Sequence, residues 1–327
     1  MKEATMTLAN AGITPESRAQ TIPVAAYFSP HPMSEAGRSM ADLLIRMPGF
    51  IAEDDPESGE PAVSRPENIE LYDKLARKIE SEFRKAFGLL APLTDNLHIG
   101  NIAIAINALE MLNSDLNGAA VYVPSVSISQ QGRYFFIANP PLIYRYLLHL
   151  RYSIPLSPST KKVWQHETIH MLDHDNIMQS ALFENSDSTS ENLKGFQLKS
   201  RIEGLAEIPY LLSGHSRYTS HLEALADYQK HLQHLRTKTA GQSLSDESFR
   251  KELFNHLILY DTGPWLILEG LRHYGGGIFR ELVEYCILKA EEKIPVGQEA
   301  INHVIDAGLT MRPADYLNSL SEITTVK

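Results

Sequence analysis

Residues 157–170 of the chain read SPSTKKVWQHETIH, and this stretch decides the predicted fold. Ser157 offers a side-chain cap, and Pro158 follows it at the first turn, a combination typical of the start of a helix. The segment therefore predicts a single helix that begins at Ser157 and continues to about Asp175.

Two histidines on this helix have the spacing of a metal site. His166 and His170 are four residues apart, so their imidazoles project from one face, one turn apart. Both rings can approach one Zn²⁺ at about 2.0–2.1 Å. Glu167 lies about 100° further round the helix, which makes it a poor ligand but a suitable base for a metal-activated water. In the HExxH pattern, the two histidines bind zinc and the glutamate acts as the general base.

With His166-Glu167-Thr168-Ile169-His170 the chain resembles the zincin metallopeptidases, and within them the gluzincins of the aminopeptidase and thermolysin type. The resemblance covers roughly residues 115–290. It implies a glutamate on a later helix as the third zinc ligand and one Zn²⁺ per chain. The motif is specific for the superfamily, but it does not identify a family or a substrate.

Two glutamates compete for the third ligand position. Glu203 lies in IEGLAE, which resembles the Glu-Gly-x-Ala segment of aminopeptidase-type gluzincins. Glu223 lies in LEALAD, which resembles a second gluzincin pattern with an aspartate four residues after the ligand. We favour Glu203 because the glycine after it is the rarer feature, and Glu223 stays open as the alternative.

Three further residues near the motif could take part in the site. Asp173 is placed to orient a ligand. His174 is a poorer ligand candidate, because three successive turns drift around the helix and one metal does not easily serve all of them. Tyr260, in LYDTG, matches the tyrosine that precedes a glycine by three positions in aminopeptidase-like gluzincins. The resemblance implies that its phenol hydrogen-bonds the tetrahedral intermediate.

The rest of the chain predicts a mixed architecture. An amphipathic helix is expected around Tyr72, Leu75, Ile79, Phe83 and Phe87, which recur at three- and four-residue steps. Other expected elements are a short helix at 34–47, a charged, proline-bearing linker at 51–67, a buried helix at 101–113, strands at 119–129 and 134–137, a loop at 175–194, and helices through most of the chain beyond Pro155.

We therefore predict an α+β fold, in which a zincin-like small sheet lies beside the active-site helix and a mostly helical subdomain follows. The expected divisions are an amino-terminal extension and linker at 1–66, a zincin-like subdomain with the HExxH helix at 67–180, and a helical subdomain at 181–327. We predict no structure for residues 1–32.

Composition excludes several other classes of protein. The formal charge of −10 argues against a nucleic-acid binder, which normally carries a clustered basic face. The one cysteine, Cys286, allows no intramolecular disulfide. No stretch reaches the roughly 18 apolar residues of a membrane span, and the amino terminus lacks the pattern of a secretory signal. We expect a cytoplasmic protein, or one exported without a cleaved signal.

The function expected from the motif and the resemblance is that of a zinc metallopeptidase. His166, His170 and Glu203 would hold zinc, Glu167 would act as general base, and Tyr260 would stabilise the oxyanion of a peptide or protein substrate. Two alternatives remain. One is a non-catalytic interaction protein on the zincin scaffold, and the other is a dedicated protease or effector that acts on a single partner protein.

Overall fold

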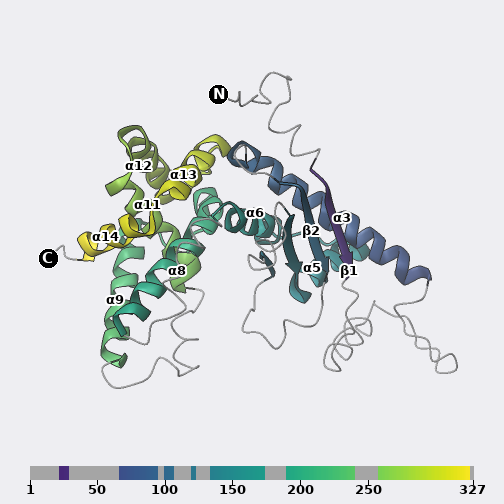
Figure 1. Cartoon of the computed structure of the whole chain (residues 1–327), viewed down its shortest axis with the longest axis horizontal. Helices are drawn as coiled ribbons and strands as arrows, with labels where there is room; N and C mark the ends of the chain where they lie inside the picture. The colour runs from purple at the N-terminus through teal and green to yellow at the C-terminus, as the bar shows by residue number, and fades with distance from the viewer. Residues whose placement is uncertain are drawn as a thin grey trace, which may run out of the picture. The chain divides into compact units, whose positions relative to one another are not determined.

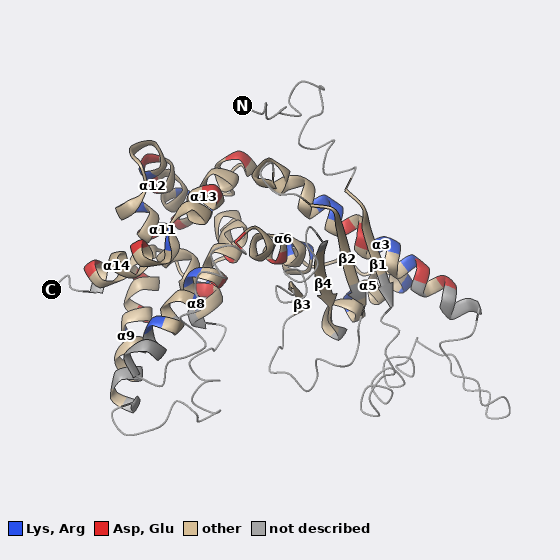
Figure 2. Ribbon diagram, in the orientation of Figure 1, with Lys and Arg blue, Asp and Glu red and all other residues tan. Residues whose placement is uncertain are grey.

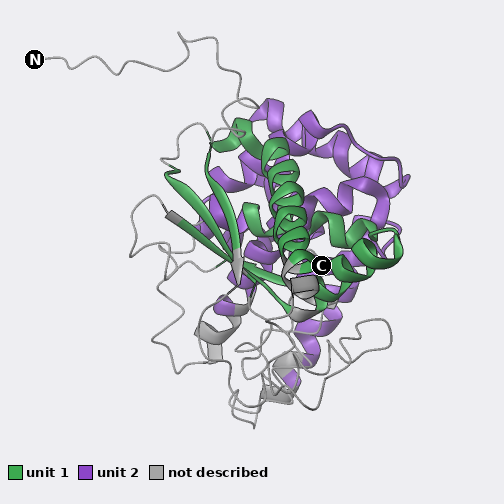
Figure 3. Ribbon diagram, turned by 90° about the vertical axis from the view of Figure 1, so that its right-hand side faces the viewer, with its two compact units in different colours: residues 1–168 green, residues 169–327 purple. Residues whose placement is uncertain are grey.

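The computed structural model describes residues 22–28, 66–94, 99–106, 119–122, 133–173, 189–239 and 257–324. The chain divides into two compact units, residues 1–168 and residues 169–327 (Figure 3). The boundary falls inside one continuous helix, α6 (Pro158–Leu172). Helices together with a small sheet give the α+β class that the sequence predicts (Figure 1).

In its described residues, the first unit contains a four-stranded mixed sheet in the order β1-β2-β4-β3. The strands are β1 (Val24–Phe28), β2 (Asn101–Ile106), β3 (Ala120–Tyr122) and β4 (Arg133–Ala138). β1, β2 and β4 run parallel, whereas β3 pairs with β4 antiparallel, Tyr122 opposite Phe136. β3 is therefore an edge strand of this sheet.

The predicted helix at 101–113 is wrong over its first half, because residues 101–106 form β2. Ile102, Ile104 and Ile106 are all buried, so the segment has the two-residue period of a strand. The alanines between them suggested a helix, but β-branched residues at alternate positions favour a strand between two neighbours. Residues 107–113 lie outside the described residues. β1 comes from the segment for which no structure was predicted.

The predicted amphipathic helix is confirmed as α3 (Pro66–Leu90), which bears Leu75, Ile79, Phe83 and Phe87 on its buried side. It begins at Pro66, so the predicted linker at 51–67 is wrong at its last two residues, and residues 51–65 lie outside the described residues. The polar side of α3 carries charges of both signs (Figure 2), several of which pair one turn apart. The ring of Phe83 packs against Trp164, 5.6 Å away, and so joins α3 to α6.

Among its described residues, the first unit contains two further helices beside α3 and α6. They are the 3₁₀-helix η3 (Ala91–Thr94) and α5 (Pro140–Tyr152). Arg145 on α5 donates a hydrogen bond to Thr160 on α6. The predicted strand at 134–137 is confirmed as β4, and the strand predicted at 119–129 is described only as β3. The helix predicted at 34–47 lies outside the described residues.

The second unit is helical throughout its described residues, as the sequence predicts for the chain beyond Pro155. Its elements are α8 (Thr189–Tyr210), η6 (Leu211–His215), α9 (His221–Thr239), η7 (Leu257–Thr262), α11 (Gly263–Tyr274), α12 (Gly277–Glu291), α13 (Gln298–Thr310) and α14 (Pro313–Thr324). Residues 263–271 of α11 are all buried, and this helix packs against α8, α12 and α14. The loop predicted at 175–194 is wrong from Thr189 onward, where α8 begins.

None of the helices among the described residues has both the length and the apolar character needed to cross a lipid bilayer.

Candidate metal centre

The helix that carries the motif begins where the sequence predicts. The side chain of Ser157 accepts a hydrogen bond from the backbone N–H of Thr160 at 3.2 Å. The Ser157 carbonyl accepts the N–H of Lys161 at 3.1 Å. Pro158 is the first helical residue, where its missing N–H costs nothing. This capping fixes the start of α6, which ends at Leu172 rather than near Asp175.

α6 has two faces of different character. Trp164 and Met171 are completely buried, and the indole N–H of Trp164 donates to the phenol oxygen of Tyr146 at 3.1 Å. His166 lies two residues beyond Trp164, about 200° round the helix, and His170 follows it one turn later. Both imidazoles therefore leave α6 on the side opposite its core contact, and both are partly exposed.

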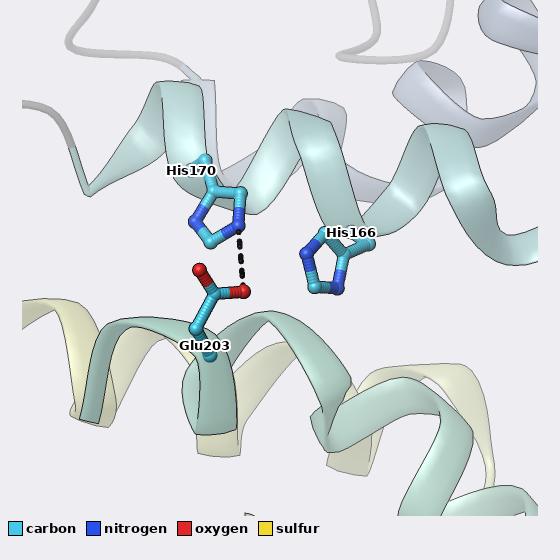
Figure 4. Close-up of side chains that lie close together, drawn as sticks. All are labelled: His166, His170 and Glu203. Atoms are coloured by element: carbon cyan, nitrogen blue, oxygen red, sulfur yellow. Dashed lines mark ion pairs between the residues drawn. The ribbon is translucent and has the colours of Figure 1, made fainter. Parts of the chain in front are cut away.

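The structure brings these two histidines together with Glu203 of α8. One ligand atom from each of the three side chains lies within 4.8 Å of the others. Figure 4 shows the Glu203 carboxylate facing the two imidazoles of α6, with 3.5 Å between His170 Nε2 and Glu203 Oε2. Within the described part of the chain, no other three His, Cys, Asp or Glu residues converge in this way.

The competing glutamate, Glu223, has a different place in the structure. Its carboxylate accepts hydrogen bonds from the backbone N–H of Thr219 at 2.8 Å and from the Thr219 hydroxyl at 2.6 Å. Its own N–H donates to Ser220 Oγ. Glu223 is thus bonded to both residues that precede α9, in an arrangement that resembles a capping box. These hydrogen bonds lower the pKa of Glu223, an exposed residue.

Glu167 points toward the sheet as well as the histidines. Its Oε2 accepts a hydrogen bond from the backbone N–H of Tyr122 on β3 at 2.7 Å. Its Oε1 lies 3.9 Å from His166 Nε2. The side chain is almost fully buried. One carboxylate oxygen is thus held by the edge strand, while the other lies next to a candidate ligand.

Tyr260 lies on η7, which packs against α8 close to Glu203. Gly263, three residues after Tyr260, touches α8 so closely that a Cβ added at Gly204 would lie 2.4 Å from the Gly263 carbonyl carbon. The absence of a side chain at Gly204 therefore allows the η7–α11 junction to approach α8 this closely. Tyr260 itself is partly buried.

Asp173 pairs with an arginine that sequence reasoning missed. Arg201 Nη1 and Nη2 donate to the two Asp173 carboxylate oxygens at 2.8 and 3.2 Å, and both side chains are fully buried. Arg201 stands two residues before Glu203, and Asp173 three after His170. The one signal in the sequence that could have suggested the Arg201–Asp173 pair is the position of Arg201, a basic residue, two residues before the proposed ligand Glu203. His174 lies outside the described residues.

The helix that carries Glu203, α8, ends at a tyrosine that the sequence analysis did not single out. Tyr210 is seven residues after Glu203, two turns along the same face. Burial raises the pKa of its phenol, and the carboxylates of Glu207 and Asp261 add to the effect. Tyr210 therefore stays protonated at neutral pH and remains a hydrogen-bond donor. The i, i+7 spacing from Glu203 was the available signal.

Comparison of the chain with models of known protein families, with curated protein sequences and with solved structures found no match. The interpretation of the site therefore depends on its geometry and chemistry.

Proposed function

We propose that this chain is a zinc-dependent hydrolase that cleaves peptide bonds, with one Zn²⁺ held by His166, His170 and Glu203. The observation that carries the proposal is the convergence of these three side chains from α6 and α8. The proposal includes the zincin-like character of the fold, which is supported by a small mixed sheet in the same unit as His166 and Glu167 and by a strand of that sheet, β3, that touches Glu167.

The three donors fit the requirements of zinc. Two imidazole nitrogens and one carboxylate oxygen are a set that catalytic zinc sites use, and such sites keep a fourth position open. Donors about 2.0–2.2 Å from one ion at tetrahedral angles lie roughly 3.3–3.6 Å apart. The 3.5 Å between His170 Nε2 and Glu203 Oε2 falls in this range. A bound zinc ion would act as a Lewis acid and lower the pKa of a water molecule in the open position.

The chain's own residues would then transfer the proton of the attacking water and stabilise the negative charge that develops on the substrate oxygen. Glu167 Oε1 accepts a proton from the attacking water and later delivers it to the leaving amine nitrogen, so the carboxylate ends the cycle unchanged. The Tyr260 phenol donates a hydrogen bond to the former carbonyl oxygen while that oxygen is negatively charged. The position of Tyr260 on η7, which packs beside Glu203, is compatible with this role.

Zinc content and turnover of four proteins test the proposal. The wild type should contain about one zinc per chain, Glu203→Gln should lose it, and Glu223→Gln, the matched control, should keep it because Glu223 serves only as a helix cap. Glu167→Gln should keep zinc and lose turnover by about 10²–10⁴-fold, the usual contribution of a general base. Turnover by Glu167→Gln at the wild-type rate would disprove the mechanism.

A peptide library provides the substrate for these assays. Cleavage of many peptides would indicate a general peptidase, and cleavage of almost none by a zinc-loaded protein would indicate an enzyme dedicated to one partner. Tyr260→Phe should slow cleavage about 10²–10³-fold without releasing zinc, as expected for the loss of one oxyanion donor. A wild-type rate in that variant would remove Tyr260 from the mechanism.

A further inference from the structure

We propose that edge strand β3 positions the general base through the backbone N–H of Tyr122, an inference that rests on the proposed function. The N–H donates to Glu167 Oε2 at 2.7 Å although the two residues are 45 positions apart. Tyr122 is therefore a positioning residue that acts through Glu167, and its main chain rather than its side chain makes the contact.

The pairing of β3 leaves this N–H available. Ala119 accepts a hydrogen bond from the backbone N–H of Asn139, so its carbonyl points toward the β4 side. Backbone groups of successive residues in an antiparallel strand point alternately toward and away from the partner. Val121 therefore faces β4, and Tyr122 faces away from it. Because β3 is an edge strand, the N–H of Tyr122 plays no part in the sheet and is instead used by Glu167.

The contact fixes a side chain that would otherwise have several rotamers. A glutamate has three side-chain torsions, and a hydrogen bond to a rigid element selects one arrangement. β3 is rigid at this point because the Tyr122 ring is buried and lies 5.3 Å from the ring of Phe136. With Oε2 held in this way, Oε1 is kept 3.9 Å from His166 Nε2, on the metal side of the carboxylate.

The hydrogen bond is also of a strong type. A backbone N–H that donates to a carboxylate makes a charge-assisted bond, roughly twice as strong as a neutral one. Both groups are almost fully buried, so water does not compete for either. Loss of a partner that orients a catalytic group typically costs about 10–100-fold in activity.

Replacement of the peptide bond before Tyr122 by an ester tests the inference. The α-hydroxy analogue of tyrosine keeps the ring, removes the N–H and leaves the Val121 carbonyl as a weaker acceptor, an effect on the pairing with β4 that the control variant at Val121 shares. We expect kcat to fall about 10–100-fold, with KM and zinc content unchanged. The matched control is the α-hydroxy analogue of valine at Val121, whose N–H faces β4. This control should lower Tm and leave kcat within about twofold of the wild type, because the Val121 N–H faces β4 and does not orient Glu167, whereas loss of an orienting partner costs about 10–100-fold.

Two readouts separate positioning from a structural role. The ester at position 122 should cause no further loss of turnover in the Glu167→Gln background, because the two changes act through one group. In ¹⁵N-tyrosine-labelled protein, amide hydrogen exchange at Tyr122 should accelerate at least tenfold in Glu167→Ala. This second measurement needs neither substrate nor zinc.

The outcomes are distinguishable. An active wild type with unchanged kcat in the ester at 122 would overturn the positioning role alone, as would an amide at Tyr122 that exchanges equally fast with and without the Glu167 carboxylate. A wild type that binds no zinc, or an active Glu167→Gln variant, would overturn the proposed function and with it this inference.

Discussion

At the scale of single residues, one buried ion pair joins the segments that carry the candidate ligands. Asp173 follows the last turn of α6, and Arg201 lies on α8. Besides the two bonds to Asp173, Arg201 Nη2 donates to the backbone carbonyls of Gly308 at 2.8 Å and Met311 at 3.2 Å. Arg201 therefore ties the end of α6, α8 and α13 together within the second unit. Buried charges are tolerated only when they are paired and hydrogen-bonded in this way.

Breaking this pair should strongly destabilise the protein. Arg201→Met leaves the Asp173 charge buried without its partner, and we expect the free energy of unfolding to fall by about 3–5 kcal/mol. Arg201→Met combined with Asp173→Leu removes both charges and should recover much of that loss. Urea unfolding measures each value. The exposed pair Arg312–Asp315 provides the control, because Arg312→Met should leave the unfolding midpoint nearly unchanged.

An Arg201→Met variant as stable as Arg312→Met would contradict the role given to the buried pair. So would a double variant that is less stable than either single variant, since that result would mean that the two side chains contribute independently and not as a pair.

The site could be predicted from the sequence only where local spacing determines it. The positions of His166 and His170 on one helix face follow from helix geometry alone. The third candidate ligand is the later glutamate that tertiary packing brings close to α6. The sequence alone did not decide between Glu203 and Glu223. The contact from Tyr122 to Glu167 carried no side-chain signal, because a backbone N–H is the same at every position and only its place at a sheet edge makes it available.

At the scale of elements, long and strongly periodic segments were predicted best. α3 repeats apolar residues over about four turns, and α6 has a capped start, so local sequence alone indicates both helices. β2 was missed because its alanines favour a helix, while the two strands that pair with it begin at residues 24 and 133, far away in the sequence. Such non-local pairing leaves no trace in a short sequence window.

The close approach of α8 to the η7–α11 junction gives a prediction at this scale. A Cβ at Gly204 would meet the backbone of Gly263 at 2.4 Å, and backbone cannot move aside cheaply. We expect Gly204→Ala to lower the free energy of unfolding by about 1–3 kcal/mol through overpacking. It should also weaken zinc binding, because the displaced helix carries Glu203. Urea unfolding and zinc titration measure the two effects.

Gly88→Ala is the matched control on α3. A Cβ there meets nothing within 4 Å, and alanine is the better helix former by about 0.5–1 kcal/mol. The same substitution should therefore stabilise the protein at Gly88 and destabilise it at Gly204. A gain in stability at both positions would show that the contact between Gly204 and Gly263 relaxes without cost.

At the scale of the whole molecule, the proposed zinc ion couples binding to folding. His166 and His170 share α6, whereas Glu203 is 33 residues further along the chain on α8, so the three donors converge only in the folded protein. A ligand that binds the folded state alone stabilises it by about 4 kcal/mol when its free concentration is a thousandfold above Kd. Zinc removal should therefore lower Tm by several degrees in a calorimetric scan with chelator.

Two variants with opposite expectations complete this experiment. Glu203→Gln should have the same Tm with and without chelator, because it lacks the third donor. Glu223→Gln should start slightly lower than the wild type, since it loses part of the cap of α9, but should still lose stability when zinc is removed. If the chelator shifted all three proteins equally, zinc would bind elsewhere in the chain, and the convergence of α6 and α8 on one ion would lose its support. A shift confined to the wild type and Glu223→Gln would link the metal to the fold through Glu203.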